Sequence, residues 1–168
     1  MTRTAQAPGS EGFRREALQL ALEAALAGRS GELEALFCRH GNLRGPRANL
    51  KLGLAFGDEG SGQAGDLVPV LTRLAQDDAP ADTARAFLPV AAAHGWCALL
   101  RTGGDVELAW NAIAVLAADA RPPVRLGTID ALTAMSAHPG SADALIERAS
   151  IWIEEADRDT RFGTAAAV

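Results

Sequence analysis

The sequence predicts an all-α fold, built as an α-solenoid of about four stacked antiparallel helix pairs. Residues 125–132 read Arg-Leu-Gly-Thr-x-x-Ala-Leu, and residues 161–168 repeat the pattern as Arg-Phe-Gly-Thr-x-x-Ala-Val. Arginines also recur at positions 47, 85, 125 and 161, at spacings of 38, 40 and 36 residues. Repetition at this period is typical of stacked helical arrays. The apolar 48% is mostly Ala and Leu, with no Tyr, which suits helix packing better than a sheet.

Length and charge predict a single domain with an uneven charge distribution. We expect a disordered tail at residues 1–11 and one helical domain at residues 12–168, whose last repeat is incomplete. Residues 1–57 carry eight basic and five acidic side chains, whereas residues 58–168 carry eight basic and sixteen acidic ones. Any contact with a polyanion is therefore expected near the N-terminus.

Cysteine usage and hydropathy favour a cytoplasmic protein with no membrane partner. Cys38 and Cys97 are isolated and have no metal-ligand spacing, as expected of small buried side chains in a reducing compartment. The first residues lack the apolar run of a signal peptide. The longest apolar stretch, residues 86–100, is interrupted by Pro89 and Gly95.

Periodicity and stop signals define the helices expected in the first half of the chain. They predict helices at residues 13–27, 30–41 and 46–57, and from Asp66 onward. Ser30 and Asp66 are the expected N-caps, and Pro46 suits a first helical position. Residues 57–65 are rich in glycine and predict a flexible linker.

The second half is expected to contain a broken segment at residues 81–101, followed by helices from residues 105, 122, 141 and 158. Pro89 and Gly95 should split the first segment near residue 94. The helix from 105 has two apolar faces, so we expect neighbours on both sides, as for an inner helix of an array. In the helix from 141, the residues expected to face inward are Leu145, Ile146, Ala149 and Ile153.

The helix from residue 158 stops at Val168, on the last position of the repeated pattern. Either the chain continues in a longer array, or the incomplete repeat meets a second copy in a homodimer.

The turns before the recurring arginines resemble those of the HEAT-repeat family. Asp119 precedes Arg125 by six positions at a helix start, and Glu155 precedes Arg161 by six. Arg85 departs from this pattern, because the residue six positions before it is Ala79, and Asp78 is one residue further away. The resemblance covers residues 30–168 and implies a right-handed superhelix. It also implies that Asp119, Arg85, Arg125 and Arg161 form a structural ladder between repeats.

A basic segment at residues 39–51 is the strongest candidate for contact with an anion or a partner. Its charged side chains are Arg39, Arg44, Arg47 and Lys51, with no acid among them. The last part of the segment sits at an expected helix N-terminus, where free N–H groups also favour anions. The alternative is a solvated turn between repeats.

Trp152 and Arg148 form a second candidate, because Trp152 lies off the expected inner side of its helix. It could line a partner groove or fill an interface between repeats. Trp96 and Trp110 are expected in the core.

Other motifs carry no chemistry. Residues 60–65 fit G-x-G-x-x-G, but they follow a helix instead of a strand and are flanked by acids. His40, His94 and His138 lack the neighbours that a metal site or a catalytic triad needs. We therefore expect no cofactor, no metal and no catalytic residues.

Two functions fit these observations. The leading hypothesis is a non-enzymatic scaffold that binds a protein partner on the concave face of the solenoid. The alternative is a nucleic-acid-binding protein similar to the HEAT-like alkylpurine DNA glycosylases, contacting phosphates through residues 39–51. Those enzymes use Trp and Asp about one turn apart, a spacing absent here, and the net charge of −5 also disfavours nucleic acid.

Overall fold

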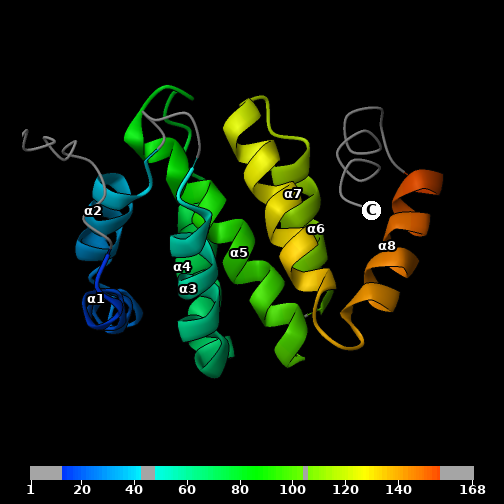
Figure 1. Ribbon diagram of the computed structural model, residues 1–168, viewed down its shortest axis with the longest axis horizontal. Coiled ribbons are helices and arrows are strands. Elements are labelled where there is room, and N and C mark those ends of the chain that lie inside the picture. The colour runs from blue at the N-terminus through cyan, green and yellow to red at the C-terminus, as the bar shows by residue number, and fades with distance from the viewer. Residues whose placement is uncertain (1–12, 43–47, 104–105, 156–168) are drawn as a thin grey trace, which may run out of the picture.

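A computed structural model describes residues 13–42, 48–103 and 106–155, and in these ranges the fold is all-α (Figure 1). The elements are α1 (Arg15–Leu26), α2 (Gly31–His40), α3 (Leu50–Gly60), η1 (Ser61–Gln63), α4 (Ala64–Ala75), η2 (Ala84–Ala86), α5 (Phe87–Thr102), α6 (Val106–Ala117), α7 (Pro122–Ser136) and α8 (Ser141–Glu155). Helix α7 begins at the predicted Pro122, and α8 begins at Ser141, the residue predicted as its N-cap. The tail, the cap at 105 and the helix from 158 lie outside the described residues.

The helices are arranged along the long axis of the molecule, from α1 and α2 at one end, through α3 with α4, then α5, then α6 with α7, to α8 at the other end (Figure 1). Helix α5 lies at the centre, where it packs against α3, α4, α6 and α7. Residues 86–99 are all buried, which explains why this segment is apolar around its whole circumference. The core of the described chain is therefore built around α5.

Helix α5 is continuous, so the predicted break at Pro89 and Gly95 is wrong. Pro89 is the third residue of the helix, where a backbone N–H would have no partner within the helix. Gly95 leaves room for a neighbouring side chain, because a Cβ there would lie 2.3 Å from Leu71 Cδ2. The proline thus starts a helix and the glycine admits a neighbouring side chain.

The flexible linker predicted at residues 57–65 is also wrong, because α3, η1 and α4 follow one another through it. Gly57 and Gly60 are buried, and a Cβ on Gly57 would lie 2.8 Å from the backbone oxygen of His94. Glycine serves here to bring two helices together. Helix α4 starts at Ala64, so Asp66 lies in its first turn instead of capping it, and Pro69 falls inside the helix.

Close glycine contacts recur on both sides of α5. On one side, a Cβ on Gly53 of α3 would lie 2.3 Å from the His94 ring. On the other side, a Cβ on Gly127 of α7 would lie 2.6 Å from Val90. Glycines therefore lie at the contacts of α5 with both α3 and α7.

Helix α6 buries one apolar face and exposes the other, so the predicted cover on both sides is wrong. Ala109, Trp110 and Ile113 belong to the buried face, whereas Val115 on the second face is 72% exposed. For helix α8, the prediction is confirmed for Leu145 and Ala149, which are buried, and wrong for Ile146 and Ile153, which are exposed. Trp152 is buried in their place.

Candidate functional site

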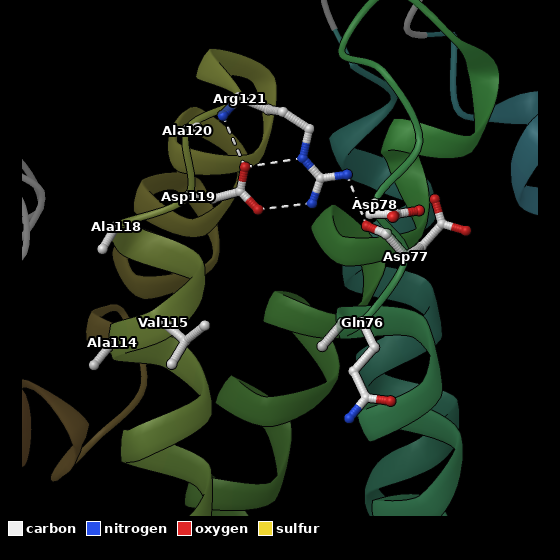
Figure 2. Close-up of a pocket in the computed structure, with 10 residues that line it drawn as sticks. Gln76, Asp77, Asp78, Ala114, Val115, Ala118, Asp119, Ala120 and Arg121 are labelled. Carbon is white, nitrogen blue, oxygen red and sulfur yellow. Dashed lines mark hydrogen bonds and ion pairs between the residues drawn. The ribbon is translucent and has the colours of Figure 1, made fainter.

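An open groove of about 710 Å³ lies between the C-terminal ends of α4 and α6 (Figure 2). Gln76 at the end of α4 and Val115 on α6 line its two walls, and alanines of α6 continue the apolar surface. Asp77 and Asp78 follow α4, and Asp119 follows α6, so acids gather where both helices end.

Arg121 spans one end of the groove. Its guanidinium donates to the Asp119 carboxylate through Nε (2.9 Å) and Nη2 (2.7 Å). Its Nη1 reaches across to the backbone oxygens of Asp77 (2.7 Å) and Ala79 (3.0 Å). Burial would raise the pKa of Asp119, but the hydrogen bonds and charge of Arg121 outweigh it and hold this pKa below its usual value. Arg121 thus ties the turn before α7 to the segment after α4.

An ion-pair network continues from this point toward α2. Arg85 in η2 donates to the Asp77 carboxylate at 2.6 Å and to Glu34 of α2 at 3.3 Å. Glu34 also accepts from Arg73 of α4 at 2.9 Å. These pairs join three successive parts of the chain on one side of the molecule, and they leave Asp77 and Asp119 already paired.

The arginines predicted as a ladder have different settings. Arg85 binds a carboxylate, but that of Asp77, eight residues before it. Arg125 donates to the backbone oxygen of Asp119 (2.7 Å), whereas the carboxylate of Asp119 accepts from Arg121. Arg161 lies outside the described residues. Sequence reasoning missed Arg121; the only signal was an arginine two positions after the turn aspartate.

Asp78 is the third acid of the groove, and its charge acts on Arg121. It is exposed and makes no ion pair within the part of the chain that the structure describes. The backbone oxygens that follow both helices already accept from arginines: those after α4 from Arg121, and those after α6 from Arg125. The groove therefore combines an exposed aliphatic side chain with an end where acids and arginines are close together.

A second polar cluster is buried between α3, α5 and α7. His94 Nε2 lies 3.7 Å from Asp130 Oδ2 and has no hydrogen-bond partner. Burial lowers the pKa of His94 to about 4 and raises that of Cys97 to about 12, so at neutral pH the imidazole is uncharged and the thiol protonated. A protonated thiol is a poor nucleophile and a poor metal ligand. Among the described residues, no group of three or more acids, histidines and cysteines could hold a metal ion.

The basic segment is described only in part. Arg39 and Lys51 are exposed, whereas Arg44 and Arg47 lie outside the described residues. Helix α3 begins at Leu50 instead of near Pro46, because Asn49 caps it: its Oδ1 accepts from Leu52 N (3.3 Å) and its Nδ2 donates to His40 O (2.9 Å).

Trp152 and Arg148 do not line a groove. Trp152 is 6% exposed and packs edge to face on Trp110, with ring centroids 5.5 Å apart. The Arg148 guanidinium lies 5.6 Å from the Trp110 ring centroid and pairs with Glu107. This cluster fills the interface of α6 and α8, which was the alternative reading of Trp152.

No protein-family model matches the chain, and comparisons with curated proteins and with solved structures gave no match. Within the described residues, no helix has the length and hydropathy needed to span a membrane.

Proposed function

We propose that the protein is a non-enzymatic scaffold of the HEAT-like type, whose stacked helix pairs form a superhelix and bind a protein partner on its concave face. The observation that supports this most strongly is the order of the helices: they succeed one another along one axis, and α3, α5 and α7 pack in series (Figure 1). Arrays of this kind present long surfaces and serve mainly in binding.

The charge distribution indicates what the partner must supply. Residues 58–168 carry sixteen acids against eight arginines, so complementary basic groups on the partner would favour association. Such binding should weaken as salt shortens the range of electrostatic attraction, from about 10 Å at 0.1 M to about 3 Å at 1 M.

A salt series on immobilised protein tests the proposal. Protein retained from a lysate of the source cells should fall severalfold between low and high salt, and the retained protein should be basic. Retention that is unchanged by salt would remove the electrostatic part. If nothing is retained at any salt concentration, the scaffold role itself loses its support.

A further inference from the structure

We infer that residues 158–168 form a helix that covers the open side of α7 at Leu126, in the way that α7 itself covers α5 at Val90. The occupant of this surface is thus a segment of the same chain that lies outside the described residues. The inference extends the helix stacking of the scaffold proposed above, and it does not depend on the identity of any partner.

The contact between α7 and α5 is the template. A Cβ on Gly127 of α7 would lie 2.6 Å from Val90 Cγ1, so α7 passes directly over Val90. Val90 is fully buried at this contact. Ala93 and Cys97, which share its side of α5 at helical spacing, are buried as well.

Helix α7 is buried on the side that meets α5 and open on the other side. Leu126, Ile129 and Thr133 share the open side at helical spacing, and none of them is buried. Leu126 is 65% exposed in the described structure. An apolar side of this kind on an inner helix of an array is normally covered by the next helix.

The sequence repeat indicates which segment covers it. Arg, Gly, Thr and Ala recur at the same places in residues 161–168 as in residues 125–132. In α7 this Gly, Thr and Ala are buried, and the Arg donates to backbone oxygens of the preceding turn. The residues that recur are therefore those with which α7 packs against the rest of the molecule.

The offset of the repeat also gives the point of contact. Gly127 lies thirty-six residues before Gly163, and Val90 lies thirty-six residues before Leu126. Moving both partners of the observed contact forward by this offset places Gly163 over Leu126. The exposed leucine thus stands where the stacking predicts the next close approach of two helices.

Helix α8 brings the chain back to the correct end of the molecule. It runs from the end where α7 finishes to the end where α7 begins (Figure 1). Leu126 is the fifth residue of α7, near its beginning. Residues 156–168, which follow α8, therefore start at the end of the molecule where Leu126 lies.

Thiol reactivity in the full chain tests whether Leu126 is covered. Leu126→Cys is compared with Leu20→Cys on α1, because both leucines are 65% exposed in the described structure. Cys38 is replaced by Ser in every variant, and Cys97 is buried. The Leu126→Cys thiol should react with a maleimide about tenfold more slowly than the Leu20→Cys thiol, because it is reached only when the covering helix opens.

A second substitution identifies the covering segment. Gly163→Leu, added to Leu126→Cys, should restore the fast reaction, because a large side chain does not fit at the close approach. Ala165→Leu is the matched control and should leave the reaction slow. It falls at the position that corresponds to Ile129, which is not buried in α7.

A disulfide then tests the contact itself. In the template, a Cβ on Gly127 would lie 3.1 Å from Val90 Cβ, close to the range of about 3.5–4.5 Å found in disulfides. Leu126→Cys/Gly163→Cys should therefore oxidise within one chain, and trypsin should release residues 126–148 joined to residues 162–168. Leu126→Cys/Ala165→Cys should form severalfold less of the linked product.

Three outcomes would overturn the inference. The first is a Leu126→Cys thiol that reacts as fast as that of Leu20→Cys, or a slow reaction that Gly163→Leu does not change. The second is equal linking at positions 163 and 165, or none. The third is a disulfide between two chains, which would replace the segment by a second copy. All three leave the scaffold function standing, because that function fails only if the salt series retains no partner.

Discussion

Replacing Gly57 with Ala tests whether α3 and α5 approach each other at a distance that only glycine permits. Gly57 has no positive φ, so the backbone itself would accept alanine. The added Cβ would lie 2.8 Å from the His94 backbone oxygen and 3.2 Å from the Ala98 Cβ. A backbone oxygen cannot rotate out of the way, so one of the two helices must shift.

Two opposing effects determine how much Gly57→Ala changes the free energy of unfolding. Overpacking a well-packed core costs about 1–3 kcal/mol, and alanine stabilises a helix interior by about 0.8–1.0 kcal/mol relative to glycine. Because the clash involves backbone, we place the packing cost in the upper part of its range. Gly57→Ala should therefore lower the free energy of unfolding by about 1–2 kcal/mol.

Gly65→Ala is the matched control, since Gly65 is also helical but a Cβ there would meet nothing within 4 Å. This variant should be unchanged or more stable by up to about 1 kcal/mol. Urea titrations followed by circular dichroism should show the two midpoints moving in opposite directions, with similar slopes. A Gly57→Ala midpoint at or above that of the wild type would refute the packing argument.

Three further predictions follow from the polar contacts and the charge. Arg121→Lys should destabilise the fold by about 2–3 kcal/mol in urea titrations, because an ammonium cannot serve Asp119 and the oxygen of Asp77 at once. Burial lowers the pKa of His94 from 6.5 to about 4, so between these pH values the imidazole binds a proton in the unfolded chain but not in the folded one. The free energy of unfolding should therefore be unaffected by His94 above pH 6.5 and should fall by up to about 3 kcal/mol as the pH is lowered toward 4. His94→Gln should remove that loss in a pH series of urea titrations. Duplex DNA should give no gel shift at low salt, given the net charge of −5.

Each of these has a contrary outcome. Wild-type stability of Arg121→Lys would mean that the bridge across the groove contributes nothing. The pH series should also be run in an Asp130→Asn background, because burial raises the pKa of Asp130 and makes that acid act in the opposite sense. An unchanged slope in His94→Gln would assign the acid sensitivity to other groups. A gel shift with duplex DNA would support the alternative function, nucleic-acid binding.

Helix α8 shows what apolar periodicity can and cannot predict. The predicted inward set and the buried set share Leu145 and Ala149, and both have helical spacing. They differ because the prediction added Ile146 and Ile153, whereas the structure buries Trp152. Spacing identifies the helix but not the side that faces the core. The Trp110 ring on α6 decides it, because it accepts an edge-to-face contact from Trp152 that the isoleucines could not make.

The candidate site could not be predicted from local sequence patterns either. The recurring arginines were visible in the sequence, but Arg121 reaches oxygens 42 and 44 residues away, and no local pattern states which arginine will do so. The groove itself exists only because α4 and α6 end side by side.

Local patterns are enough to predict that the described chain is helical and that helices begin near Pro122 and Ser141, because proline, serine and apolar periodicity act over a few residues. The roles of Gly57 and Gly95 depend instead on packing between distant helices. In a local pattern, glycine indicates a break in a helix. Its missing side chain is an advantage only where another helix must come within contact distance, and for Gly57 that helix is nearly forty residues away in the chain.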